Sequence, residues 1–313
     1  MKISKLGEFG IIDRIKRKPK DKNILVGIGD DAAVVKIGSK LAVFTTDTLV
    51  EGDHFNLSYF TARQVGKKAI EVNISDIGAM GAVPKYALIS LALRKDLDVK
   101  FVDELYKGLR QAAAKYGVEI IGGNLTHANQ VFIDIDMIGF VEKKKLCLRS
   151  QAKPGDFILV SGDLGGSTAG LNLFQNKIKG HNNVKKKHLE PKANLHKVKP
   201  YLKHINAMED ISDGLASEVS HICKESDVGA IIYADNIPIQ DETKNAAISI
   251  KKDALDFALY GGEDFELVYT IPEKNLNKVK GFLVGEITKN KEIKIYKNGK
   301  FSRLKKHGFD HYL

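Results

Sequence analysis

The sequence is poor in cysteine and proline, and it has no long apolar run. Its two cysteines, Cys147 and Cys223, lie far apart and form no CxxC pair, which argues against a disulfide framework and favours buried thiols in a reducing compartment. No stretch approaches the roughly 18 apolar residues of a membrane helix. The N-terminus lacks the apolar core of a signal peptide. We therefore expect a cytoplasmic protein with no membrane partner.

Several familiar catalytic motifs are also missing. The chain contains no GxxxxGK[ST] and no GxGxxG in a dinucleotide-binding context, so the usual glycine-rich nucleotide loops have no support. It contains no HExxH and no GxSxG, so zinc hydrolases and serine hydrolases have none either. These absences leave a set of acidic segments as the main candidates for chemistry.

The positive net charge of +10 is concentrated in one Lys-rich segment, residues 177–203. This segment holds nine lysines against one glutamate, and most of the excess charge disappears without it. It has no arginine and a single aromatic residue, Tyr201, so it lacks the stacking groups of a nucleic-acid surface. We interpret it as a solvated loop or helix face, with phosphate steering and nucleic-acid binding as the alternatives.

Strand-length apolar runs alternate with helical patterns along the 313 residues. The run 131–140 (VFIDIDMIGF) alternates apolar and polar residues, as in an antiparallel strand with one polar face. This organisation predicts an α/β or α+β fold. A change in composition near 146–156 predicts two domains, 1–145 and 146–313. The predicted strands are 24–28, 41–46, 86–93, 131–140, 157–161, 230–234 and 265–271.

Three helices are predicted from periodicity and end signals. The strongest pattern begins after Asp98, a good N-cap residue, and ends at Gly117, which readily adopts the left-handed C-cap conformation. A second helix covers about 61–80, and a third opens at Ser212–Asp213. The third is expected to turn Leu215, Val219 and Ile222 inward.

Five short acidic segments are spread along the chain. Each places Asp or Glu beside Gly, Ser or Thr at the edge of an apolar run. Carboxylates a few ångströms apart repel one another, so their convergence requires a strongly positive guest. More than one Mg²⁺, together with the phosphates of a nucleotide, would satisfy that requirement. The segments are GIGDDAAVV (27–35), TTDTLVEGDH (45–54), NISDIGAMG (73–81), MEDISDGL (208–215) and YGGEDFELV (260–268).

Taken alone, each segment has a simpler interpretation. Asp30 could belong to an ordinary acidic turn, and Ser212 or Asp213 could merely cap a helix. Asp76 is harder to explain, because its neighbours in a helical pattern are apolar and a carboxylate near a buried face needs a partner. The loop 161–171 (SGDLGGSTAGL) could cradle an anion on the free amides at the start of a helix.

In this order and spacing, the acidic segments resemble those of the thiamine-monophosphate kinases, in the superfamily of aminoimidazole ribonucleotide synthetase and selenophosphate synthetase. The motifs that carry the resemblance are GDDAAV, TTDTLVEGDHF, ISDIGAMGA, SGDLGGS, DISDGL and GGEDFEL. It implies a homodimer whose N-terminal sheets join into a β-barrel, with the nucleotide near the subunit interface. It also implies Mg²⁺-assisted, in-line transfer of the ATP γ-phosphoryl group to thiamine monophosphate, giving thiamine diphosphate.

The resemblance also assigns roles to individual residues. Asp47, Asp76 and Asp210 would form the catalytic centre. The thiamine phosphate would be held by His54, Glu263 and Phe309. The contacts to ATP would come from Tyr106, Gly123, Asn124, Arg149 and Ser212. The ligands of Mg²⁺ would be Asp30, Thr45, Thr46, Asp47, Asp76, Asn124, Asp210 and Asp213.

Two positions depart from the family pattern. Asn124 follows two glycines where the family has Asp, and its amide oxygen would bring no charge to Mg²⁺. Asn194 stands where relatives carry Arg, so nearby lysines would have to supply the charge. The alternatives are a sister activity such as the ring-closing synthetase, and a non-catalytic module that binds nucleic acid or anions. Selenophosphate synthesis is disfavoured because neither cysteine lies in an N-terminal glycine-rich loop.

Overall fold

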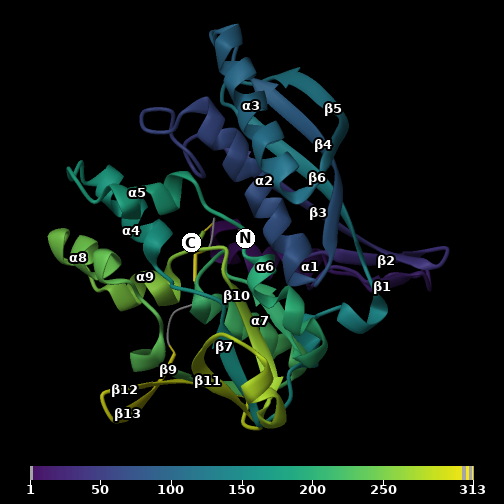
Figure 1. The fold of residues 1–313 in the computed structure, drawn as a ribbon, viewed down its shortest axis with the longest axis vertical. Helices are drawn as coiled ribbons and strands as arrows, with labels where there is room; N and C mark the ends of the chain where they lie inside the picture. The colour runs from purple at the N-terminus through teal and green to yellow at the C-terminus, as the bar shows by residue number, and fades with distance from the viewer. Residues whose placement is uncertain (1–2, 305–307, 310–311, 313) are drawn as a thin grey trace.

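Two mixed β-sheets organise the chain in a computed structural model that describes residues 3–304, 308–309 and 312 (Figure 1). The first sheet contains β1 (Ile24–Val26), β2 (Ala33–Ile37), β3 (Lys40–Val50), β4 (Val83–Leu93), β5 (Glu119–His127) and β6 (Phe132–Val141). The second contains β7 (Asp156–Val160), β8 (Met208–Asp210), β9 (Gly229–Tyr233), β10 (Leu267–Pro272), β11 (Phe282–Thr288), β12 (Ile293–Lys297) and β13 (Lys300–Arg303).

Strands that follow one another in the sequence are often not adjacent in the sheets. The first sheet runs β1-β2-β3-β6-β4-β5, and the second runs β13-β12-β9-β11-β7-β10-β8. Most pairs are antiparallel, while β4 with β5 and β9 with β12 are parallel. The predicted mixture of α and β elements is therefore confirmed.

Helices cover both sheets. They are α1 (Gly7–Ile15), α2 (Ala62–Ala79), α3 (Val99–Tyr116), α4 (Gly166–Gln175), α5 (Asn182–Leu189), α6 (Leu195–Val198), α7 (Leu215–Ser226), α8 (Asp241–Ser249) and α9 (Ala254–Tyr260). In Figure 1, α2 and α3 lie together beside the first sheet, while α4, α5, α8 and α9 form a separate group. Among the described residues, none of these helices has the length and apolarity needed to cross a bilayer.

Two of the three predicted helices, α2 and α3, form where their end signals indicated, whereas the third, α7, begins at Leu215 after Gly214. In α3, the Asp98 side chain accepts a hydrogen bond from the backbone N–H of Lys100 (2.7 Å), and Gly117 adopts a left-handed φ of 68°. In α2, Thr61 and Gln64 form a reciprocal capping box. Each of the seven predicted strands overlaps an observed one, and the three inward residues predicted for α7 are buried.

Close packing of α2 against α3 fixes the position of α2. A side chain at Gly66 would place its Cβ 2.2 Å from the carbonyl oxygen of Leu105, and one at Gly108 would place it 2.0 Å from the carbonyl oxygen of Arg63. The two helix backbones therefore touch, and a methyl group at either glycine would force them apart. The other side of α2 packs on β3 and β6.

The edge strand β5 was not predicted. It pairs in parallel with β4, and almost every residue along it is exposed. Two glycines and an asparagine give the segment a low strand propensity, and it has no buried face that would produce alternation. Gly123 is required by a close approach, because a Cβ there would lie 1.8 Å from the carbonyl oxygen of Ile89. Ile121 and Leu125 on this strand are 58% and 69% exposed.

Candidate active site

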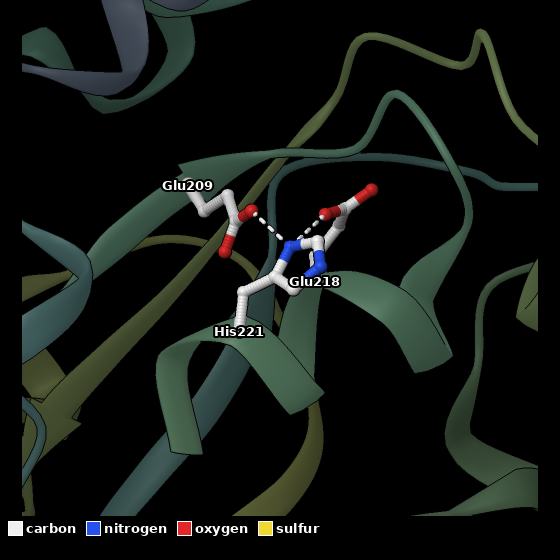
Figure 2. Close-up of side chains that lie close together, drawn as sticks. All are labelled: Glu209, Glu218 and His221. Atoms are coloured by element: carbon white, nitrogen blue, oxygen red, sulfur yellow. Dashed lines mark hydrogen bonds and ion pairs between the residues drawn. The ribbon is translucent and has the colours of Figure 1, made fainter. Parts of the chain in front are cut away.

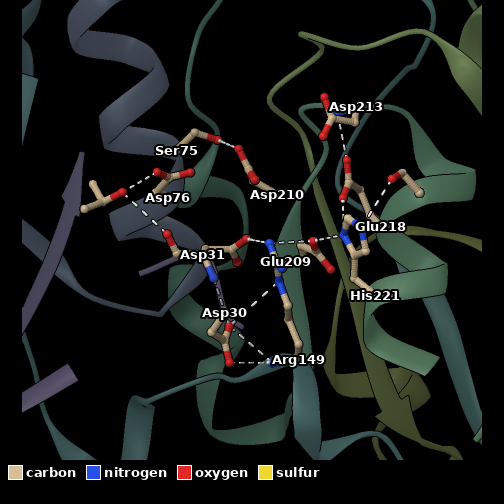
Figure 3. Close-up of polar contacts among 12 residues, drawn as sticks. Asp30, Asp31, Ser75, Asp76, Arg149, Glu209, Asp210, Asp213, Glu218 and His221 are labelled. Carbon is tan, nitrogen blue, oxygen red and sulfur yellow. Dashed lines mark hydrogen bonds and ion pairs between the residues drawn. The ribbon is translucent and has the colours of Figure 1, made fainter. Parts of the chain in front are cut away.

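Acidic side chains from remote segments meet where the end of α2 contacts β3 and β8 (Figure 3). The Thr45 hydroxyl on β3 donates a hydrogen bond to Asp76 on α2 (2.5 Å). The Ser75 hydroxyl donates one to Asp210 at the end of β8 (2.5 Å). Asp47, two residues after Thr45 on β3, shares a hydrogen bond with Asp76. The acidic segments around 47, 76 and 210 therefore converge.

We call the carboxylates of Asp30, Asp31, Asp47, Asp76 and Asp210 the acid cluster. Too little positive charge lies near them for all of them to stay ionised together. Burial raises the pKa of Asp30 to about 7, helped by the charge of Asp31. Burial likewise raises the pKa of Asp47 to about 7. The pKa values of Asp76 and Asp210 are raised well above the ordinary value by burial and by neighbouring carboxylates.

The acid cluster fits divalent cations. Asp31 has a buried Oδ2 with no hydrogen-bond partner among the described residues. Carboxylate and hydroxyl oxygens are the hard ligands that Mg²⁺ prefers, and a bound cation would remove the repulsion that raises these pKa values. Asp31 was not among the predicted ligands, although the adjacent pair Asp30–Asp31 was visible in the sequence.

One predicted ligand faces away from the acid cluster. Successive side chains of a strand point to opposite faces, so Thr46 is directed away from the face that carries Thr45 and Asp47. Its hydroxyl instead donates to Asp134 on the outer face of the sheet (3.3 Å).

Three predicted nucleotide contacts also lie elsewhere in this single chain. Tyr106 lines a shallow depression on α3 together with Lys107 and Arg110. Gly123 and Asn124 lie on β5, and β6 and β4 separate that strand from β3. Three strand spacings amount to about 14 Å, so the fold of one chain does not bring these residues to the acid cluster.

Arg149, a fourth predicted nucleotide contact, lies directly beside the acid cluster. Its guanidinium contacts Asp31 and lies 2.7 Å from the carboxylate of Glu209. Its backbone N–H donates to Asp30 (3.2 Å). Arg149 thus joins the turn after β1 to β8, the strand that carries Asp210, as Figure 3 shows.

A charged network centred on His221 was missed by the sequence analysis. The Nδ1 atom of His221 lies 2.8 Å from Glu209 and 3.1 Å from Glu218, and both carboxylates are buried (Figure 2). The three ligand atoms lie within 4.8 Å of one another, close enough to hold a metal ion. However, the Arg149 guanidinium already contacts the same oxygen of Glu209. We therefore read the group as an ion-pair network, whose only sequence signal was the i,i+3 spacing on α7.

This network corrects the capping interpretation of Ser212 and Asp213. The N-cap residue of α7 is Gly214, with φ of 103° and no side-chain cap. The backbone N–H of Asp213 instead donates to Glu218 (2.7 Å). The side chain of Asp213 is therefore not used as a cap and remains available to the site.

One cavity of about 390 Å³ joins the two groups of predicted residues. It is lined by the predicted acceptor contacts His54, Glu263 and Phe309. It is also lined by the predicted metal and nucleotide residues Asp47, Asp76, Ser212 and Asp213. Asp30, Thr45, Thr46 and Arg149 line a neighbouring depression of about 430 Å³. The hydrogen bond between Thr45 and Asp76 links the two.

The amides of the glycine-rich loop 161–171 are occupied by a carboxyl group of the chain itself, Asp264, whose pKa is raised to about 7 by burial. The carboxylate of Asp264 accepts hydrogen bonds from the backbone N–H groups of Gly165 (2.6 Å) and Ser167 (3.1 Å) at the start of α4. The expectation of an anion cradle was right about the chemistry. It could not anticipate that Asp264, from another segment, occupies these amides.

Comparison with known proteins identifies the family to which the chain belongs. Residues 29–141 match the family described as AIR synthase related protein, N-terminal domain, and residues 153–297 match the corresponding C-terminal domain. The fold and the acid-lined site thus define an AIR synthase related protein. The thiamine-monophosphate kinase of Aquifex aeolicus is 39% identical over 281 residues, which cover 88% of this chain and 90% of that protein. The enzyme of Escherichia coli (strain K12) is 34% identical over 326 residues, covering 98% of both.

A solved structure is also similar throughout. The structure described as "AaThiL complexed with AMPPCP and TMP" has a TM-score of 0.90 and 36% identity, and the match covers 99% of both chains. Given this similarity over nearly the full length, the chain belongs to the thiamine-monophosphate kinase family.

Proposed function

We propose that this chain transfers the γ-phosphoryl group of ATP to the phosphate of thiamine monophosphate, giving thiamine diphosphate. The observation that carries the proposal is the shared cavity, where the acidic residues Asp47, Asp76 and Asp213 lie with the predicted acceptor contacts His54 and Glu263. A relative of 36% identity has been solved with AMPPCP and TMP bound together, which supports both substrates.

The side chains of the site suit a reaction between two anions. The accepting oxygen belongs to a phosphate that is already ionised, so no strong general base is required. Asp30, Asp47, Asp76, Asp210 and Asp213 would hold Mg²⁺. When bound, Mg²⁺ supplies the positive charge that lets two phosphates approach and that offsets charge on the transferred group. The fixed carboxylates keep donor and acceptor aligned for in-line transfer.

We further propose that the two depressions take the two substrates. The nucleotide phosphates would lie beside Asp30 and Arg149, and the thiamine monophosphate molecule would lie beside His54, Glu263 and Phe309. The residues at the junction, Thr45 and Asp76, would lie where the phosphoryl group passes. Ser212 would contact the nucleotide from the acceptor side.

A homodimer in the cytoplasm is part of the same proposal. Residues 1–145 would form the nucleotide-binding and dimerisation domain, and 146–313 the second α/β domain. Pairing of N-terminal sheets into a β-barrel would cover the exposed edge strand β5. It would also give Tyr106, Gly123, Asn124 and Thr46 a site at the subunit interface. Neither nucleic acid nor membrane is a partner in this proposal.

Substitution of the central acids tests the activity. Asp47→Ala and Asp76→Ala should each lower turnover by at least about 100-fold, because even groups that only orient a metal ligand contribute 10–100-fold. Turnover is measured as thiamine diphosphate formed from ATP and thiamine monophosphate, with circular dichroism as the control for folding. Removal of Mg²⁺ by EDTA should abolish nucleotide binding as well as turnover. Near-normal activity in both variants would take these residues out of the metal site.

The alternative activity, that of the ring-closing synthetase, is tested in parallel. The ribonucleotide substrate of the ring-closing synthetase replaces thiamine monophosphate in an ADP-release assay. We expect nucleotide turnover only with thiamine monophosphate. Turnover with the ribonucleotide alone would contradict the proposed function while leaving the fold unchanged.

A further inference from the structure

A single buried ammonium group contacts two of the residues assigned to the acceptor. Lys68 on α2 has no exposed surface. Its Nζ atom lies 2.5 Å from a carboxylate oxygen of Glu263 and donates a hydrogen bond to the backbone carbonyl of His54 (2.6 Å). A buried lysine is costly unless it is paired, so these contacts fix where its charge can lie.

Both oxygens of the Glu263 carboxylate have partners within the chain. Its second oxygen lies 3.4 Å from Nδ1 of His188. Its backbone has a left-handed φ of 66°, and its N–H donates to the carbonyl of Ser212 (2.7 Å). Burial alone would raise the pKa of Glu263, but the charge of Lys68 and the contacts with His188 together outweigh it and hold the pKa at about 2. Non-glycine residues adopt such a backbone conformation only where their surroundings impose it.

One face of α2 connects the acid cluster with the residues that surround Glu263. Lys68, Val72 and Asp76 follow one another at intervals of four residues, so they lie on the same face of the helix. Val72 and Asp76 both line the cavity. The eight residues from Lys68 to Asp76 span about 12 Å. The helix therefore sets the separation between the acid cluster and Glu263.

Residues of the Lys-rich segment 177–203 pack against α2 and against the chain next to Glu263. Glu71 on α2 accepts a hydrogen bond from the backbone N–H of Ala193 (2.8 Å). The amide of Asn194 donates to the carbonyl of Phe265, two residues after Glu263 (3.2 Å). His188 on α5 belongs to the same segment. Part of this segment thus packs beside the proposed acceptor site, whereas the sequence favoured a solvated loop or helix face, with phosphate steering and nucleic-acid binding as the alternatives.

We propose that Lys68 is a positioning residue that fixes the carboxylate of Glu263 and the backbone of His54 for the heterocyclic end of the acceptor. The inference rests on the proposed function. Because Lys68 already neutralises Glu263, this carboxylate is not a counter-ion for the positively charged thiazolium. It is an oriented hydrogen-bond acceptor for an N–H donor, such as the amino group of the pyrimidine. Its recognition therefore depends on the direction in which Lys68 holds it.

The test separates acceptor binding from the rest of the reaction. Lys68→Met should raise KM for thiamine monophosphate about 10-fold or more, the size expected for a hydrogen bond to a charged group. It should leave kcat and KM for ATP within about 2-fold, since Lys68 contacts neither Mg²⁺ ligands nor the nucleotide depression. Lys115→Met is the matched control, because it removes another ion pair with α2, that between Lys115 and Glu71. This control should leave KM unchanged.

A second variant guards against loss of folding. Lys68→Met leaves a buried carboxylate unpaired, whereas Lys68→Arg keeps the charge and displaces Glu263 through its larger planar head. Lys68→Arg should therefore keep the thermal stability of the parent and still raise KM for thiamine monophosphate. A double-mutant cycle with Glu263→Gln should be non-additive in KM, because Lys68 acts through that carboxylate.

Each outcome decides between defined alternatives. If the parent protein does not phosphorylate thiamine monophosphate, the proposed function fails. If the parent does so and folded Lys68→Arg retains its KM, the positioning role of Lys68 fails alone. Equal increases in KM for both substrates, or an equal effect of Lys115→Met, would likewise reduce Lys68 to a purely structural residue.

Discussion

The pKa values of individual acids make the metal-free site sensitive to pH. Asp30 and Asp47 have pKa values of about 7 in the folded chain, against an ordinary value of 3.8. A carboxylate whose pKa is raised by folding binds its proton more tightly in the folded state. Its contribution to stability is therefore fully present below about pH 4, and it is lost as the pH rises through 7.

This leads to a prediction for the protein in EDTA. Its free energy of unfolding should fall between pH 5 and pH 8, and addition of Mg²⁺ at pH 8 should restore it, because the cation replaces the lost protons. Urea denaturation at a series of pH values measures both effects. The variant Asp47→Asn should flatten the pH dependence. A profile unchanged by Mg²⁺ would contradict the assignment of these acids as its ligands.

At the level of single residues, the sequence was informative wherever a polar group sat in an apolar setting. Asp76 stood out because its helical neighbours are apolar, and it does lie in the acid cluster. Glu209 and Lys68 gave no comparable signal, since their partners come from segments far away in sequence. Contacts of this kind depend on tertiary packing, which no local pattern encodes.

Among the elements, α4 depends on a carboxylate that is remote in sequence. Asp264→Ala should lower the free energy of unfolding by about 1–2 kcal/mol, because two amides at the start of α4 lose their acceptor. Asp253→Ala, which removes the exposed cap of α9, is the matched control and should cost about 0.5–1 kcal/mol. Urea denaturation at pH 8, where Asp264 is ionised, gives both values. An equal cost for the two would show that the α4 amides do not need Asp264.

Elements with strong end signals were predictable, and elements stabilised by their neighbours were not. The helices α2 and α3 carry their own caps, so their ranges could be read within a residue or two. The strand β5 has no apolar face, and the lysines of α5 suggested a solvated segment. Both exist because other parts of the chain pair with them or pack against them.

For the whole molecule, the exposed strand β5 predicts self-association. Leu125→Glu should produce a monomer, because a charge on the edge strand opposes pairing with a second copy. Loss of the dimer should also lower turnover if the nucleotide site needs the subunit interface. Analytical ultracentrifugation and the kinase assay measure these effects. Ile248→Glu on α8 is the control, since that side chain is 72% exposed and belongs to another part of the fold. A Leu125→Glu dimer with full activity would contradict the interface at β5.

The mixture of strands and helices could be predicted from the pattern of apolar runs, but the order of the strands within the two sheets could not. Placing β6 between β3 and β4 requires a long-range pairing that sequence periodicity cannot specify. The same pairing decides that Asn124 on β5 lies apart from the acid cluster in one chain.

The cavity has a practical consequence for anyone preparing the protein. Glu8 near the beginning of the chain and Phe309 near its end line the same cavity. A label attached at Glu8 or Phe309 would therefore lie beside the proposed substrate cavity and obstruct it. The β12–β13 hairpin, with its turn at Asn298–Gly299, offers a more remote place for a label or an anchor to a solid support.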